Sequence, residues 1–239
     1  ITEAPSAITV IEARDIQRFG SHGQIAKLLE MEPGIDVSQS GLFDFNINTR
    51  GFNSSLNRRV LILLDGRDLG TAFLGATEWN GLSTPVEELG RIELVRGPGS
   101  ALYGANAFNG VMNISSIKPK DVTGTRINIT AGESESYRSD IRFSNTVGRL
   151  SYRTMLGGYQ GKSFVTSRKN YNFEYKGLTA LNNEQIDVSK DAIRSIYGSM
   201  RIDYELDEKS FVTGEGGYTQ VENETIVTGI GRVQVQKAS

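Results

Sequence analysis

The stretch that decides the fold is Arg96–Ile114, "RGPGSALYGANAFNGVMNI", which follows the strand-like run "RIELV". Its segment Gly99–Gly104 holds two glycines with four residues between them, as in a phosphate-binding loop. Such a loop also needs a lysine and then a serine or threonine after the second glycine, to reach the phosphates and hold magnesium. Ala105 and Asn106 occupy those places, so both chemical groups are missing. The stretch therefore predicts glycine-permitted tight turns and not a nucleotide site.

The composition excludes several other classes of function. The chain has 239 residues, with 26 Lys and Arg against 28 Asp and Glu. This near-neutral balance, without a basic block, argues against a nucleic-acid partner. The absence of cysteine and the single histidine exclude disulfides, thiolate zinc sites and a His-rich metal site. His22 is interpreted as a solvated residue at a helix start, and no G-x-S-x-G elbow accompanies it. We expect no enzyme, no cofactor and no resident metal.

Residues 1–120 have the pattern of a compact α+β domain. The runs "SAITVI", "GIDV", "FNINTRGF", "RRVLILL", "RIELV" and "GVMNI" predict short strands. Ser21 with Gln24 forms a capping box before apolar residues at helical spacing, which predicts a helix that a Pro-Gly pair ends. Thr84 with Glu87 forms a second capping box and predicts a further short helix.

The pattern changes after "KPK" at 118–120, where alternation of apolar and polar residues begins. It runs through "TRINITA", "YRSDIRFS", "LSYRTML" and "SIYGSMRIDYEL", with a weaker fifth segment in "SFVTGEGGYTQV". In the fourth segment Met200 and Ile202 face one way, while Arg201 and Asp203 face the other. Five such strands in a row, with charges on one face, predict a sheet with lipid outside and an aqueous lumen inside.

The connections between these strands sharpen the prediction. Tight turns near Gly148 and Glu208 should lie at one end of the sheet, and the long loop 159–192 at the other, as in an outer-membrane barrel. The longest apolar run, "VLILL", is far short of the roughly 20 residues of a membrane-spanning helix. Five strands cannot close a barrel, because about eight is the lower limit. We therefore expect the N-terminal part of a longer protein, with a processed or trimmed start because no Met opens it.

Five longer segments follow one another in a characteristic order: "APSAITVIEARDI", "IAKLLEMEPGIDV", "NINTRGF", "VLILLDGRDL" and "GRIELVRGPGSALYGANAFNGVMNI". In these segments the chain resembles the TonB-dependent outer-membrane receptor family. The resemblance implies that residues 1–120 are an α+β plug domain. Residues 121–239 would then be the N-terminal strands and loops of a transmembrane β-barrel that is incomplete in this chain.

The resemblance also implies a latch between plug and barrel. Arg50 in "TRGF" and Arg96 in "VRGP" match arginines that pair with barrel-wall carboxylates in the family. A buried charge without a partner is costly, so each arginine needs an acid. The family's usual Glu before its "RIEVLRGP" motif is Gly90 here. The nearest internal acids for this latch are Glu87, Glu88 and Glu93.

Ligand contacts are expected in two loops, "SGLFDFN" and "LGTAFLGATEWNG", at the plug apex. Their aromatic residues lie among small and polar neighbours, outside any helical or strand period: Phe43, Phe45, Phe73 and Trp79. The alternative is that these rings belong to the plug core or contact the barrel. Aromatic loops with few charges suit a bulky chelate or a macrocycle better than a small anion.

The function implied is import of a scarce, bulky ligand across the outer membrane of a Gram-negative cell. A ferric siderophore comes first, with cobalamin, haem and oligosaccharide open. In the family TonB, driven by the proton gradient, pulls the plug from the periplasm through an N-terminal box, which this chain does not contain. The other partners expected are the ligand and outer-membrane lipid. The alternatives are a periplasmic signalling or interaction module without transport, and a passive porin.

Overall fold

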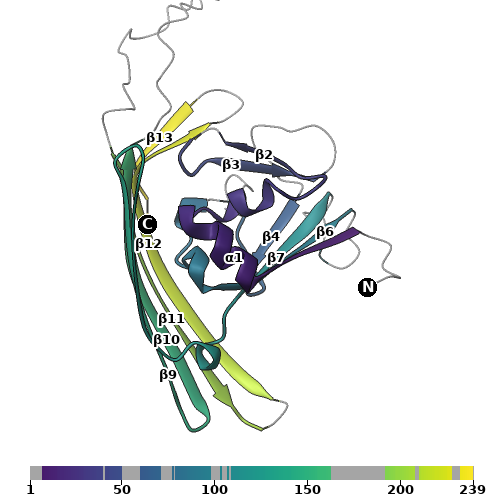
Figure 1. The fold of residues 1–239 in the computed structure, drawn as a ribbon, viewed down its shortest axis with the longest axis vertical. Helices are drawn as coiled ribbons and strands as arrows, with labels where there is room; N and C mark the ends of the chain where they lie inside the picture. Colours follow the sequence, from purple (N-terminus) through teal and green to yellow (C-terminus); the bar gives the residue numbers. More distant parts are fainter. Residues whose placement is uncertain are drawn as a thin grey trace, which may run out of the picture.

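The computed structural model describes residues 7–39, 41–49, 60–70, 77, 79–97, 103, 107, 109–162, 192–207, 210–227 and 232–238. Two large sheets dominate it. A five-stranded sheet has the order β1-β6-β7-β4-β5, and a six-stranded sheet, here called the wall, has the order β13-β12-β11-β10-β9-β8. The wall is a long curved sheet, and the N-terminal region lies against its concave side (Figure 1).

The five-stranded sheet gathers strands from both ends of the N-terminal region. Its β7 pairs with β6 in antiparallel and with β4 in parallel orientation. Because β7 is the last of these strands in the chain, the centre of the sheet is formed by its final segment. A separate hairpin is formed by β2 and β3. The bounds are β1 (Ala7–Glu12), β2 (Asp36–Gln39), β3 (Phe45–Asn48), β4 (Val60–Leu64), β5 (Arg67–Asp68), β6 (Leu89–Arg96) and β7 (Gly110–Ser116).

The helices differ from the predicted ones. The first is α1 (Ala13–Phe19), before the expected start at Ser21. It was missed because Ile16 is its only buried residue, so apolar periodicity gives no signal. The other helical elements of the described chain are short 3₁₀ turns, and the first of them ends at the left-handed Gly23, with φ of 73°. These turns are η1 (Gly20–His22), η2 (Ile25–Leu29), η3 (Trp79–Gly81), η4 (Val86–Glu88) and η5 (Pro119–Asp121).

Both predicted capping boxes are therefore wrong. The residue that precedes η2 is Gln24, and its side chain makes no capping hydrogen bond. The residue that precedes η4 is the extended Pro85, which has no hydroxyl with which to cap. Ser21 lies inside η1, and Thr84 stands one residue before the N-cap of η4, so neither hydroxyl residue occupies the capping position.

The core of the N-terminal region lies between the five-stranded sheet and the short helices. It consists of apolar side chains from β1, β3, β4, β6, β7, α1, η2, η3 and η4, with Phe45 and Trp79 among them. Its most deeply buried members have no exposed surface: Ile16, Leu29, Leu89, Ile92, Met112 and Ile114.

The wall confirms the alternating segments. Every neighbouring pair of its strands is antiparallel. The five predicted segments are its first five strands, and β13 adds a sixth. Their bounds are β8 (Gly124–Gly132), β9 (Ser136–Val147), β10 (Leu150–Lys162), β11 (Ala192–Glu205), β12 (Phe211–Val227) and β13 (Arg232–Ala238).

The ends of the wall also lie as predicted. Leu150 pairs with Val147 across the tight turn that contains the left-handed Gly148, and Leu150 pairs with Tyr204 on its other side. Glu205 pairs with Phe211, so the β11–β12 connection around position 208 starts and finishes at this same end. The ends of β10 and β11 that flank the long loop pair at the opposite end. Positions 208 and 163–191 themselves lie outside the described residues.

The two faces of the wall differ as the alternation predicts. Large apolar side chains stay exposed on the convex face, among them Ile127, Ile129, Ile141, Phe143, Leu156, Ile196 and Met200. Charged and polar side chains are buried on the concave face against the N-terminal region, among them Asp140, Ser144, Arg153, Arg201 and Asp203. In the described part of the chain, helices long and apolar enough to cross a membrane are absent.

Candidate functional site: the boundary between plug and wall

Two adjacent acids on η4 point at arginines of the wall. Glu87 forms an ion pair with Arg138 of β9, and only 13% and 10% of the two side chains are exposed. The Nε of Arg138 also donates to Asp140 Oδ2 at 2.7 Å. A guanidinium held by two carboxylates has a fixed plane, so this pair is directional as well as charged.

Glu88 is the most buried acid of the boundary, with 2% of its surface exposed. Its Oε1 accepts a hydrogen bond from Arg142 Nε at 3.2 Å, and its Oε2 lies 3.9 Å from Arg153 Nη1. The Arg153 side chain is 1% exposed. Each of these charges needs the other because an unpaired charge at this depth is strongly destabilising.

A third acid lies at the turn after β4. Asp65 Oδ2 lies 3.7 Å from Arg201 Nη1, and Asp65 Oδ1 accepts the backbone N–H of Ser116 at 2.9 Å. The Oγ of Ser116 accepts hydrogen bonds from Arg153 and Arg201, each at 3.2 Å. Arg201 is also held by Asp203 at 3.0 Å. We call the acids and arginines that meet across the boundary the boundary network: Asp65, Glu87, Glu88, Arg138, Arg142, Arg153 and Arg201.

The wall also holds the segment that leads into it. Arg153 donates to the carbonyl of Ile117, and Arg142 donates to the carbonyl of Val122. Ser144 Oγ donates to the carbonyl of Pro119 at 2.7 Å. The connection between the two sheets is thus held through its own backbone.

The residues expected to form the latch lie in different places. Arg50 lies outside the described residues. Arg96 is half-buried and donates to the carbonyl of Pro33, and no carboxylate is among its described contacts. Glu93 forms an ion pair with Arg91 at 2.9 Å inside its own sheet, away from the wall. The described boundary has the opposite polarity to the predicted latch, because the acids come from the N-terminal region and the arginines from the wall.

The arginines of the boundary network were not singled out from the sequence. Alternation places Arg138, Arg142, Arg153 and Arg201 on the polar face of their strands, and they lie on that face in the structure. Which acids they meet depends on how two sheets pack, and strand periodicity carries no information on that.

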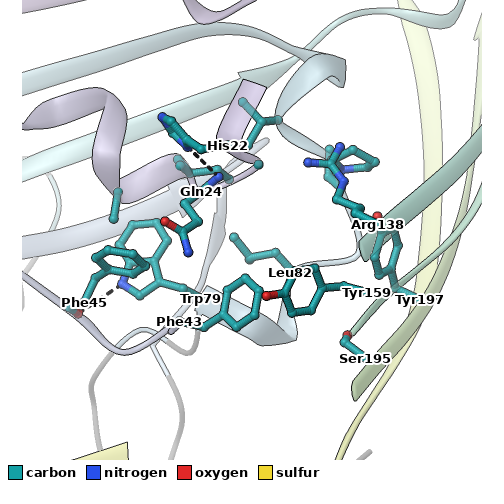
Figure 2. A pocket seen from close by; sticks show the side chains of 16 residues that line it. His22, Gln24, Phe43, Phe45, Trp79, Leu82, Arg138, Tyr159, Ser195 and Tyr197 are labelled. Carbon is teal, nitrogen blue, oxygen red and sulfur yellow. Dashed lines mark hydrogen bonds between the residues drawn. The ribbon is translucent and has the colours of Figure 1, made fainter. Parts of the chain in front are cut away.

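Three of the four predicted aromatic residues, Phe43, Phe45 and Trp79, line a pocket between η1–η4 and the wall, with a volume of about 70 Å³ (Figure 2). Phe43 stacks edge-on against Tyr159 of β10, with ring centroids 4.5 Å apart. Phe45 and Trp79 are only 7% and 8% exposed, and Trp79 Nε1 donates to the carbonyl of Phe45 at 3.2 Å. Phe73 lies outside the described residues. Both proposed readings of these rings stay open, with Phe45 and Trp79 belonging to the core in this state.

His22 lies at the rim of this pocket and is exposed, as expected. Its Nδ1 accepts the backbone N–H of Gln24 at 3.0 Å, which places the ring proton on Nε2. Loss of water around the ring lowers the pKa of His22, and the nearby Lys27 lowers it further. Within the described residues, groups of three acidic or histidine side chains that could hold a metal ion are absent.

Residues 1–111 match the family model described as the TonB-dependent receptor plug domain. These residues form a plug domain of the kind found in TonB-dependent receptors. A curated relative, the vitamin B12 transporter BtuB of Vibrio vulnificus, is 28% identical over 187 residues. The match covers 75% of this chain and 30% of that relative, so the chain spans about a third of its length.

Solved structures of receptors share the fold. The pyoverdine receptor FpvA of Pseudomonas aeruginosa bound to pyoverdine has a TM-score of 0.64 at 19% identity, covering 92% of this chain and 28% of that one. The siderophore receptor PirA of Acinetobacter baumannii has a TM-score of 0.61 at 19% identity, covering 92% and 32%. The fold is therefore an α+β plug followed by antiparallel strands of a transmembrane barrel that is incomplete in this chain. The proteins named are transporters and receptors, not enzymes.

Proposed function

We propose that this chain is the plug and the first wall strands of an outer-membrane receptor that imports a scarce, bulky ligand. A ferric siderophore is the first candidate, and cobalamin and haem follow. TonB would pull the plug from the periplasm, using the proton gradient of the inner membrane. The observation that carries this proposal is the boundary network, in which a plug is held by charges to the concave face of a sheet whose convex face is apolar.

The chemistry of the boundary suits a plug that must move. Apolar surfaces that separate expose area to water at about 25 cal/mol per Å². When water enters the lumen, each acid and arginine of the boundary network can replace its contact with the partner by contacts with water. The cost is low because a hydrated charge recovers most of its solvation. A charged boundary therefore seals the lumen at rest and can still be opened and re-formed.

For ligand recognition we propose the loop around Phe43, at the end of the wall that carries the long β10–β11 loop, together with the segment around Phe73, which lies outside the described residues. Phe43 contacts Tyr159 of the wall, so a ligand that displaces the Phe43 ring would change a contact between the plug and the wall. Phe45 and Trp79 would support that loop from the core.

Uptake by the full-length protein in the outer membrane tests the proposal. Cells that lack other receptors would be supplied with radiolabelled ferric siderophores, cobalamin or haem, with and without TonB and with the proton gradient collapsed. We expect uptake of one ligand class that stops when either TonB or the gradient is removed. Uptake that is unchanged without TonB would overturn active import and favour a passive porin.

Detergent dependence addresses the other alternative. A periplasmic signalling module should stay monodisperse in buffer without detergent, whereas a receptor with lipid-facing strands should aggregate when detergent is removed. Monodisperse full-length protein in plain buffer would overturn the assignment of the wall to a membrane.

A further inference from the structure

One row of the wall places three residues directly opposite one another on neighbouring strands. Asp140 of β9 pairs with Gly157 of β10, and Gly157 pairs with Tyr197 of β11. The hydroxyl of Tyr197 donates a hydrogen bond to Asp140 Oδ1. Neighbouring strands lie about 4.8 Å apart, so this bond spans roughly 10 Å of sheet. The Tyr197 ring therefore lies across β10, over Gly157.

The position under the ring requires glycine for reasons of space. A Cβ at Gly157 would lie 2.6 Å from two atoms of the Tyr197 ring and 2.6 Å from Asp140 Oδ1. At the next residue, Gly158, the nearest atom to such a Cβ would be a backbone oxygen at 3.4 Å, which is ordinary contact. Neither glycine has a positive φ, so backbone strain does not distinguish them. A methyl group at 157 displaces the ring or the carboxylate, whereas a methyl group at 158 displaces nothing.

The carboxylate that Tyr197 holds is the one that orients the boundary network. Asp140 is 5% exposed and accepts from Arg138 Nε at 2.7 Å, while Arg138 reaches Glu87 of the plug with Nη2. Figure 2 shows Arg138 and Tyr197 together on the wall side of the pocket. A carboxylate fixed by a hydroxyl on one oxygen and a guanidinium on the other has no freedom to rotate. The direction of the Arg138 side chain is thereby set from two strands away.

We infer that Gly157 and Tyr197 are positioning residues for the plug. Because Gly157 has no side chain, the Tyr197 ring can lie over β10 and donate its hydrogen bond to Asp140. Asp140 in turn orients the Arg138 side chain toward Glu87. Neither residue touches the plug acid. The consequence of this inference for transport rests on the proposed function. The contact between plug and wall that it describes can be measured without any ligand.

The test uses a thiol placed at the boundary of the full-length receptor. Ser83 is 9% exposed, stands just before η4, and accepts a hydrogen bond at its carbonyl from Ser199 of the wall. The chain has no cysteine, so Ser83→Cys introduces its only thiol. In outer membranes, the rate of labelling by a water-soluble maleimide reports how often the plug separates from the wall, with the receptor lacking this substitution as the blank.

We expect Tyr197→Phe and Gly157→Ala each to raise the labelling rate about tenfold, the effect of losing one hydrogen bond to a charged group. The matched control, Gly158→Ala, should stay within about twofold of the parent. A folded barrel is recognised by its heat-modifiable migration in electrophoresis. If Gly157→Ala does not fold, Tyr197→Phe decides alone, because it removes only an oxygen atom.

A double variant separates positioning from a general loss of stability. Once Tyr197→Ser has removed the ring and its hydrogen bond to Asp140, adding Gly157→Ala should raise the labelling rate by much less than it does in the parent, because only the contact with Asp140 Oδ1 remains to be relieved. Additive effects, a Tyr197→Phe rate equal to the parent, or a Gly158→Ala rate as high as that of Gly157→Ala would each overturn the inference. If the labelling pattern holds but no ligand is imported, the proposed function fails and the positioning role stands.

Discussion

The interior of the plug is packed with aliphatic side chains, whereas its boundary with the wall is lined with charges. Ile92 and Ile114 have no exposed surface and touch other apolar groups. Glu88 is almost as deeply buried, yet its neighbours are two arginines. Burial alone therefore does not distinguish the two regions. The apolar core contacts determine the fold of the plug, whereas the charged contacts of the boundary network determine only its position against the wall.

The largest effect should come from the boundary. Glu88→Gln leaves Arg142 and Arg153 buried without their acid, and removing one partner of a buried pair costs roughly 3–5 kcal/mol. We expect the Ser83→Cys thiol to be labelled much faster and the outer membrane to admit small antibiotics. The matched control is Glu93→Gln, whose acid pairs inside its own sheet. Equal leakage in the two variants would contradict the contrast between the regions.

A core substitution should act differently. Ile92→Ala removes three carbon atoms from a fully buried site and should cost about 2–5 kcal/mol of plug stability. Hydrogen exchange of the full-length receptor should then show faster exchange throughout the five-stranded sheet. Met31→Ala, at a side chain that is 86% exposed, should change nothing measurable. A local effect confined to the boundary would show that the plug does not unfold as one unit.

Substitutions on the convex face of the wall test whether lipid covers that face. Leu156→Arg, at a side chain that is 59% exposed in the apolar band, should cost about 2–4 kcal/mol if lipid covers it. Tyr137→Arg should cost less, because its row across the sheet holds Gln160 and Arg194 and so lies near the edge of the band. The folded fraction in the outer membrane measures both. Equal yields would mean that water covers this face.

The smallest effect concerns His22. Its pKa is lowered below 6.5 in the folded chain, so the unfolded chain binds the proton more tightly. The stability from the neutral ring is complete above about pH 6.5 and is lost as pH falls from there toward the folded pKa. The loss should stay below about 1 kcal/mol, because the ring is exposed and screened by solvent. Thermal unfolding at pH 7.5 and 5.5 should show it in the parent and not in His22→Asn.

Sequence patterns predicted the wall better than the helices. A period of two fixes which side chains share a face, so the buried Arg201 and the exposed Met200 lie on the two faces that the alternation predicts. The helix α1 offered only Ile16 to a pattern that needs several buried members. The boundary network was out of reach for another reason, because Glu88 and Arg153 are brought together only by the packing of two sheets.

The place of β7 in the plug sheet has a consequence for assembly. β1 and β4 precede it by many residues, and β4 has no partner in the sheet other than β7 and the two-residue β5. The core of the plug therefore cannot close until the chain up to Ser116 has been synthesised, and contacts this distant in sequence form slowly. Within three residues the chain reaches Pro119, whose carbonyl is bound by Ser144 of the wall. The strand that completes the plug sheet and the first contact of the connection with the wall are thus neighbours in the chain, so closing the plug core brings Pro119 near the strand that binds it.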